Sequence, residues 1–147
     1  MQILFGHDQA VTAWAAQKID GLSQPTHAFG LIDGAGVLRG CLILNEITAN
    51  TADLVVYSEA PITANVVRPF FRIVFDVLHY GRLQTIAERS NAKSRKDTPR
   101  WGFKWDGTAR DFFGHGRDAL RFVMLRADCR FLKPKPTESN DGHVLEA

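Results

Sequence analysis

The chain has 147 residues, 45% of them hydrophobic and 23% charged, and its formal net charge at pH 7 is +2. This size and composition predict one globular domain and leave no room for a second core. No run approaches the roughly 20 consecutive apolar residues that a bilayer span needs, and the opening MQILFGHDQA lacks the layout of a signal peptide, so we expect a cytoplasmic protein without a membrane partner.

The charges are distributed unevenly along the chain. Residues 1–81 contain four Lys or Arg against seven Asp or Glu, residues 82–135 contain 14 against six, and residues 136–147 contain none against three. The basic segment favours an anionic ligand, which is a phosphorylated cofactor, an acidic partner surface or nucleic acid. A solvated charged face explains the same pattern. Nucleic acid is the weakest of these interpretations, because no aromatic stacking platform accompanies the cations.

The first part of the chain predicts a strand, a helix and then three strands. Residues 1–5 suit a short strand, and residues 7–19 place apolar side chains at helical spacing. From residue 27 the pattern changes to β-branched and aromatic residues, with turn residues at 33–36. Residues 27–58 therefore predict a three-stranded antiparallel meander.

The second part predicts a helix, a strand, a short helix and a hairpin. Pro69 suits a first helical turn, apolar residues follow it at spacings of three and four, and Gly81 ends the helix. After a strand at 83–89, KWDGTARDFF and ALRFVMLRADCRFL read as two strands joined by the glycine-containing GHGRD. We expect the domain to cover residues 1–133 and a polar C-terminal tail to cover 134–147.

The complete order, β-α-βββ-α-β-α-ββ, predicts an α/β (α+β) fold whose mixed, mostly antiparallel central sheet is flanked by helices. Cys41 and Cys129 lie in apolar surroundings and at no metal-binding or redox spacing. We therefore interpret both as buried reduced thiols.

A motif in the basic segment carries a resemblance to a known family. Residues 90–111 read SNAKSRKDTPRWGFKWDGTARD: Asn-x-x-Ser, a short helix, a Gly-Phe pair, an acid with Gly, and Arg with an acid. The positions concerned are Asn91, Ser94, Gly102, Phe103, Asp106, Gly107, Arg110 and Asp111. This motif resembles the C-terminal motif of the GNAT acetyltransferases, especially the subgroup that modifies the N-termini of ribosomal proteins. The order of elements matches the GNAT core as well.

The resemblance implies a cofactor and a reaction. Proteins of this family bind acetyl-CoA where the fourth and fifth strands part, and the acceptor amine attacks the thioester directly. The acceptor would be a protein N-terminus, a lysine or a small amine. A backbone N–H near Val56 or Tyr57 would donate to the thioester oxygen.

The phosphate end of acetyl-CoA is held in the family by a glycine-rich loop between the fourth strand and the long helix. Here that loop reads SEAPITANVVRP and contains no glycine. Thr63, Asn65 and Arg68 offer hydroxyl, amide and guanidinium donors at the helix start, which itself favours an anion.

Further cofactor contacts are implied after the fifth strand. Asn91 would contact the pantetheine arm, although an Asn at this place also suits a helix cap. Lys93 and Arg95, with Lys96 and Arg100, would meet the 3′-phosphate of the nucleotide, and the same cations also read as a solvated basic turn.

The resemblance also implies catalytic residues. Ser94 is the candidate acid for the leaving thiolate, since Thr98 stands where many relatives have a Tyr, and a Ser near a helix start is otherwise an ordinary capping residue. Glu46 and Asp111 are the candidate bases for the acceptor amine, with surface charge as the alternative for each.

Two functions stay open from the sequence. The first is an acetyl-CoA-dependent N-acetyltransferase with an amine-bearing protein or small molecule as its partner. The second is a catalytically degenerate GNAT-fold binding or structural protein of the kind that phages encode, located in the virion rather than the cytoplasm. The apolar run at 121–132 favours a homodimer or a larger protein assembly in either case.

Overall fold

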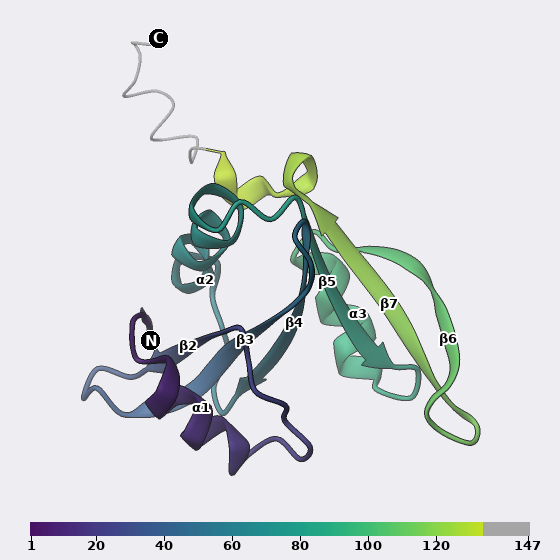
Figure 1. Ribbon diagram of the computed structural model, residues 1–147, viewed down its shortest axis with the longest axis horizontal. Coiled ribbons are helices and arrows are strands. Elements are labelled where there is room, and N and C mark those ends of the chain that lie inside the picture. The colour runs from purple at the N-terminus through teal and green to yellow at the C-terminus, as the bar shows by residue number, and fades with distance from the viewer. Residues whose placement is uncertain (134–147) are drawn as a thin grey trace, which may run out of the picture.

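Seven strands form one mixed sheet, in the order β1-β2-β3-β4-β5-β7-β6, in the computed structural model of the chain, which describes residues 1–133 (Figure 1). The strands are β1 (Gln2–Leu4), β2 (His27–Ile32), β3 (Leu38–Thr48), β4 (Thr51–Ser58), β5 (Arg82–Glu88), β6 (Lys104–Gly114) and β7 (Arg117–Leu125). The β4–β5 pair is parallel and the other five pairs are antiparallel. The predicted α/β fold class and the predicted 27–58 meander are confirmed. The expected 134–147 tail lies outside the described residues.

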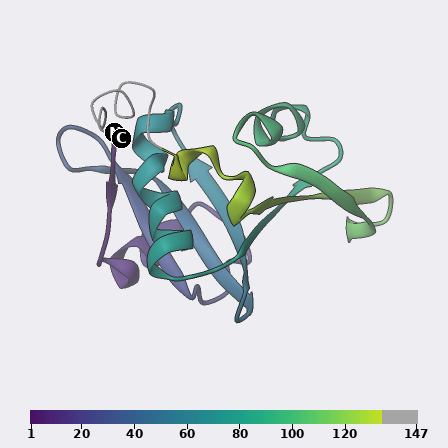
Figure 2. The same ribbon diagram turned by 90° about the horizontal axis from the view of Figure 1, so that it is seen from above.

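Helices cover both faces of the sheet. On one face, α1 (Asp8–Ala16) packs Val11 and Ala15 against a small core that includes Cys41 and Ile43. On the other face, α2 (Ala64–Arg72) lies along the sheet and forms the larger core (Figure 2). The third helix, α3 (Ala92–Arg100), is followed by residues that join that larger core. We call the two sides of the sheet the α1 face and the α2 face.

The long helix begins earlier than its sequence predicts. It starts at Ala64, so Pro69 lies inside α2 rather than in its first turn. A proline in a helix interior costs about 3 kcal/mol. The buried side chains of Val67, Phe70 and Phe71 offset this cost by packing on the sheet.

The same helix also ends differently. Its last part is a π-helical turn (Ile73–Val77), and the chain reverses at His79, whose φ of 61° lies in the left-handed region. Gly81 does not close the helix. Its amide instead donates to the Asn50 carbonyl at 3.0 Å, and a Cβ added to Gly81 would lie 2.5 Å from the Asn50 side chain. Gly81 thus allows the close approach that aligns β5 beside β4.

The predicted last strand is shorter than expected. It ends at Leu125, and the chain continues as two short 3₁₀ turns, Arg126–Asp128 and Arg130–Leu132. Phe131 leaves the sheet to stack on Phe71 of α2, with ring centroids 4.9 Å apart. The buried Cys129 therefore lies in a turn and not in a strand. Both cysteines are free and buried, as predicted.

The two halves of the sheet part between β4 and β5. Their ladder contains three pairs, the last of which joins Asp53 to Gln84. Beyond it, β4 stays with β3 up to Ser58, and β5 stays with β7 up to Glu88. The strands therefore diverge, as Figure 1 shows. Within residues 1–133, no helix has the length and apolar character that a membrane crossing requires.

Candidate active site

The divergence of β4 and β5 turns one edge of β4 toward an opening. Successive residues of a strand direct their N–H and C=O groups to opposite sides. The Leu54 carbonyl accepts a hydrogen bond from the Thr85 hydroxyl on the β5 side at 3.0 Å, and Tyr57 pairs with Cys41 on the β3 side. Val56, two residues after Leu54, consequently directs its N–H toward β5, where the ladder has already ended.

Asp53 lies where this opening begins, in the last pair of the β4–β5 ladder, and its side chain is on the α1 face. It shares this face with Val55 and Tyr57, which pack against the core beneath α1. Burial raises the pKa of the Asp53 carboxyl to about 6, although the hydrogen bond from the Gln84 side chain acts in the opposite direction. A carboxylate with a pKa in this range can accept a proton near neutral pH.

A cleft of about 340 Å³ on the α1 face contains this carboxylate. It combines an apolar wall with a few polar groups, as small-molecule sites do. Its lining residues are Ser23, Asn45, Ile47, Asp53, Gln84, Ile86, Ala109, Phe112, Ala119 and Arg121. Ser23 comes from the segment between α1 and β2, and the others come from five strands of the sheet.

A polar network crosses the sheet beside the cleft, from β4 to β6. Gln84 donates to Asp53, and its side-chain oxygen accepts from an Arg82 nitrogen at 3.2 Å. The same Arg82 nitrogen donates to Asp106 at 3.2 Å, and Arg121 Nε donates to the same Asp106 oxygen at 3.3 Å. Because Arg82 occupies the Gln84 oxygen, the Gln84 amide nitrogen is the group that faces Asp53.

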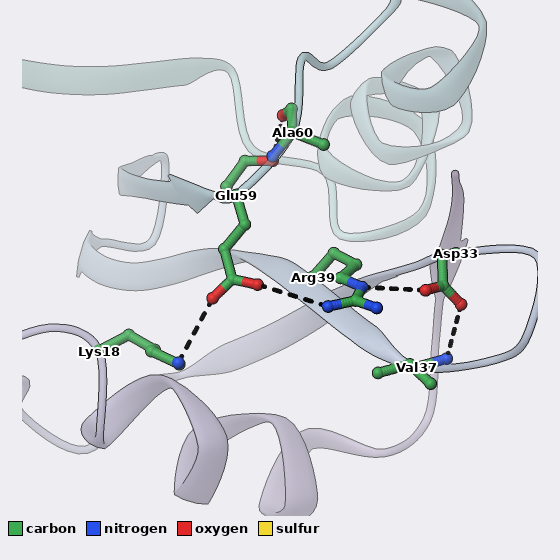
Figure 3. A network of polar contacts seen from close by, with 7 residues as sticks. Lys18, Asp33, Val37, Arg39, Glu59 and Ala60 are labelled. Carbon is green, nitrogen blue, oxygen red and sulfur yellow. Dashed lines mark hydrogen bonds and ion pairs between the residues drawn. The ribbon is translucent and has the colours of Figure 1, made fainter.

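A second network fixes the chain where β4 ends. Glu59 binds Lys18 at 3.3 Å and Arg39 at 4.0 Å, and Arg39 also binds Asp33 at 2.9 Å (Figure 3). Glu59 therefore ties the exit of β4 to the segment after α1 and to the β2–β3 turn. Exposed ion pairs of this kind stabilise by at most about 1 kcal/mol, so the network positions the loop more than it stabilises the fold.

No protein-family model matches the sequence, and no curated protein matches it either. Solved structures do match the fold. A GCN5-related N-acetyltransferase from Brucella melitensis superposes with a TM-score of 0.63 at 25% identity over 82% of this chain, which spans 59% of that protein. Together with the parted fourth and fifth strands, this decides the fold. The chain has the GNAT fold.

Two further GNAT structures are similar. Spermidine N-acetyltransferase from Vibrio cholerae, in complex with CoA and spermine, matches with a TM-score of 0.64 at 18% identity, over 73% of this chain and 68% of that one. The dodecameric form of a Vibrio cholerae spermidine N-acetyltransferase matches with a TM-score of 0.62 at 18% identity, over 69% and 65% of the two chains.

The two predicted bases lie away from Asp53 in this GNAT fold. Glu46 pairs with Ala52 on the α2 face and accepts a hydrogen bond from the Tyr80 hydroxyl at 2.7 Å. Asp111 lies near the β6–β7 turn, where its carboxylate accepts from the Gly116 amide at 2.9 Å. The α1-face cleft is lined by neither of these carboxylates.

The predicted acid lies on a helix beside β5. Ser94, Asp97 and Thr98 are the partly buried residues of α3, and their spacing of three and four places them on its inner side. Asn91 caps this helix, because its side-chain oxygen accepts from the Ser94 amide at 3.1 Å. The capping interpretation of Asn91 is therefore confirmed.

The predicted phosphate contacts are distributed over two helices. Thr63 is the N-cap of α2, with Asn65 in its first turn, and the Thr63 side chain makes no capping hydrogen bond. The Arg68 guanidinium points to the C-terminal turns, where it donates to the carbonyls of Phe131 and Lys133 at 3.2 and 3.3 Å. It also lies 5.7 Å from the centroid of the Phe131 ring.

The predicted 3′-phosphate contacts are exposed residues of α3. Lys93 pairs with Asp97 at 2.7 Å, and its side chain is 88% exposed. Arg95 is exposed on the same helix. Both cations are accessible to an anion at the surface.

Acetyl-CoA fits the described residues at its thioester end, because the Val56 N–H is directed into the opening and the Val56 side chain is 47% exposed beside it. At the phosphate end, the loop between β4 and α2 has no glycine. The positive end of the α2 dipole and the exposed α3 cations remain as anion-binding groups there.

Sequence reasoning missed Asp53, Gln84 and the Arg82–Asp106–Arg121 cluster. A signal was present, since Asp53 and Gln84 are polar residues inside short apolar strands. Their pairing across two strands remote in the sequence becomes visible only once the β4–β5 register is known.

Proposed function

We propose that the chain is an N-acetyltransferase that moves the acetyl group of acetyl-CoA to an amine. The observation that carries the proposal is the half-buried Asp53 carboxylate at the point where β4 and β5 part, with the Val56 N–H further along the same strand. Three residues of strand span about 10 Å, which leaves room for an amine and one water molecule between the two groups.

Each group has a separate task in this proposal. Bound acetyl-CoA supplies an activated thioester. The Val56 N–H donates to the thioester oxygen as negative charge develops on it. Asp53 accepts a proton from the amine, directly or through water, and Gln84 orients the carboxylate. Ser94, on the inner side of α3, is the proposed proton donor to the departing thiolate, a role that rests on the Asn-x-x-Ser resemblance to the ribosomal-protein subgroup.

The phosphate end is held by other groups. Thr63, Asn65 and the α2 N-terminus are the proposed partners of the pyrophosphate, and Lys93 and Arg95 on α3 are the proposed partners of the 3′-phosphate. Asn91 positions α3 as its cap and remains a candidate for contact with the pantetheine arm.

Two measurements test the function. Titration calorimetry with acetyl-CoA and CoA measures cofactor binding, and a thiol-release assay with a panel of amines measures transfer. Micromolar binding, together with transfer that falls by about 10²- to 10⁴-fold in Asp53→Asn, is the expected result. Absence of binding at millimolar acetyl-CoA would contradict the proposal.

The alternative is a catalytically degenerate GNAT-fold binding or structural protein, including a phage virion component. The observation in its favour is the glycine-free loop before α2, together with the engagement of Arg68 by the C-terminal turns. Under this alternative, the wild-type chain would bind neither acetyl-CoA nor CoA and would form a stable assembly by light scattering.

A further inference from the structure

We propose that the acceptor is a small molecule carrying a carboxylate as well as the reacting amine, with its amine at Asp53 and its carboxylate at Arg121. This inference rests on the acetyltransferase proposed above and names the class of amine that the α1-face cleft selects. Both residues line the same cleft.

The charge balance beside the cleft favours an anion. Arg82 and Arg121 share one carboxylate, that of Asp106, at 3.2 and 3.3 Å. Two guanidinium groups against one carboxylate leave one formal positive charge, since arginine stays protonated. Among the charged residues of this cluster, Arg121 is the one that lines the cleft, and its side chain is 40% exposed.

The guanidinium of Arg121 also keeps donors for a ligand. Its Nε donates to the Asp106 carboxylate, and one terminal nitrogen donates to the Asp106 carbonyl at 2.8 Å. A guanidinium has five N–H groups, so these two contacts hold the group in place and leave the other N–H groups to bind a carboxylate.

The spacing of the two ends defines the ligand. Asp53 is on β4 and Arg121 is on β7, with β5 between them, so their strands lie about 10 Å apart across the sheet. Arg121 pairs with Ile86, two residues beyond Gln84. A molecule whose amine and carboxylate are separated by about 6–10 Å can therefore reach both residues.

The surface between the two ends is apolar. Ile47, Ile86, Phe112 and Ala119 line the cleft together with Asp53 and Arg121. A short methylene chain suits such a wall because it has no polar group to desolvate. The class that combines these features is an ω-amino carboxylate.

The same arrangement disfavours a polyamine. Asp53 is the one carboxylate among the residues that line the cleft within the described part of the chain. A second ammonium group would lie near the Arg121 guanidinium, where like charges repel. The cleft therefore discriminates between the two ends of its ligand by charge.

Three matched probes test this inference: 5-aminopentanoate, pentylamine and 1,5-diaminopentane, which share a five-carbon chain and differ at the far end. Calorimetric titration of the wild-type chain measures binding without requiring turnover. We expect 5-aminopentanoate to bind roughly 10- to 100-fold more tightly than pentylamine, the range of a charge-assisted hydrogen bond, and 1,5-diaminopentane to bind no better than pentylamine. The order of kcat/KM for acetyl transfer should be the same.

Substitutions of Arg121 test whether this residue selects the carboxylate-bearing amine. Arg121→Gln should abolish the advantage of 5-aminopentanoate over pentylamine, whereas Arg121→Lys, which keeps the charge, should retain part of it. Arg110→Gln is the matched control, since Arg110 is exposed on the neighbouring strand β6 and does not line the cleft. Circular dichroism confirms that each variant is folded.

The outcomes separate the two proposals. The inference would be overturned if 1,5-diaminopentane bound as tightly as 5-aminopentanoate or more tightly, or if the preference for 5-aminopentanoate persisted in Arg121→Gln. In either case, acetyl transfer to any amine would still support the acetyltransferase. Binding of 5-aminopentanoate through Arg121 without acetyl transfer would support the carboxylate site and contradict the acetyltransferase.

Discussion

Asp53 of β4 lies directly opposite Gln84 of β5 in the last pair of the parallel ladder, and the Gln84 side chain donates a hydrogen bond to the Asp53 carboxylate. Burial raises the pKa of this carboxyl and the hydrogen bond lowers it, and burial prevails, so that the pKa is about 6. The point where the sheet opens therefore carries a group that titrates close to neutral pH.

Replacement of Asp53 by Asn should stabilise the fold at high pH. The pKa of Asp53 is about 6 in the folded chain, above the ordinary value of 3.8 for an aspartate, so the folded state binds the proton more tightly. Stability contributed by this group is present below pH 4 and is lost as the pH rises through 6. Asp53→Asn should thus be more stable than the wild type by about 1–3 kcal/mol at pH 8, with little difference near pH 4.

Urea unfolding at pH 4, 6 and 8 measures this effect. Asp20→Asn, at an exposed position after α1, is the control and should match the wild type at each pH. Identical stabilities of Asp53→Asn and wild type at pH 8 would show that Asp53 is not destabilised by burial.

Removal of the Gln84 amide should move the pH dependence of catalysis. The Gln84 hydrogen bond lowers the pKa of Asp53, and a leucine in its place also excludes water. In Gln84→Leu, the acidic limb of kcat/KM should therefore shift from near pH 6 to higher pH. Carbon-13 NMR titration of the Asp53 carboxyl provides a second readout that needs no turnover. An acidic limb at the same pH as in the wild type would show that Gln84 does not control the ionisation of Asp53.

Local sequence patterns predict the strands, whereas tertiary packing determines where α2 begins and where the last strand ends. Alternation and turn residues predicted the 27–58 meander because its pairs are close in sequence. Local propensity favours Pro69 at a helix start because proline is disfavoured inside a helix, yet the burial of its neighbours extends α2 in front of it. Phe131 reads as part of a strand, but its stacking on Phe71 takes the chain away from the sheet.

The candidate site was predicted in part for the same reason. The Asn91 cap belongs to one short segment, in which the capping oxygen and the Ser94 amide are three residues apart. Asp53 and Arg121 are 68 residues apart and meet in one cleft only through the order β4-β5-β7. Spacing along the sequence contains no signal for such a pair.

Substitutions of Asn91 can distinguish its structural role as a helix cap from a direct contact with the cofactor. Its side-chain oxygen caps α3, so Asn91→Ala should cost about 1 kcal/mol in unfolding free energy. Asn91→Asp keeps the capping oxygen and should retain stability. If Asn91 acts only as a cap, Asn91→Asp binds acetyl-CoA as the wild type does. A loss of affinity in this stable variant would show a direct contact with the cofactor.

Arg68 should act mainly on stability. Its guanidinium joins α2 to the carbonyls of Phe131 and Lys133, and its Nε is buried without a hydrogen-bond partner among the described residues. Arg68→Met keeps much of the apolar stem and should lower the unfolding free energy by about 1–3 kcal/mol. The dissociation constant of acetyl-CoA, measured below the melting temperature, should change by less than about threefold.

The contrary result for Arg68 is equally specific. A tenfold weaker affinity for acetyl-CoA with unchanged stability would mean that the guanidinium leaves the C-terminal turns and binds the phosphates. Arg72→Met, on the last turn of the same helix, is the matched control for the loss of one positive charge.

Proline substitutions can test the strand edge at β4. Val56→Pro removes an N–H that is directed into the opening, so no ladder hydrogen bond is lost and the fold should be retained. Tyr57→Pro removes an N–H that faces β3 opposite Cys41, and the lost ladder hydrogen bond should destabilise the sheet by about 1–3 kcal/mol.

The two variants separate catalysis from folding. If the Val56 N–H stabilises charge on the thioester oxygen, Val56→Pro lowers kcat by about 10²- to 10³-fold, the range for loss of one oxyanion donor. Thermal unfolding should show a native-like Val56→Pro and a destabilised Tyr57→Pro. A Val56→Pro variant that is folded, binds acetyl-CoA and keeps its kcat would remove this amide from the mechanism, because the substitution deletes the donor and leaves the β3–β4 ladder intact.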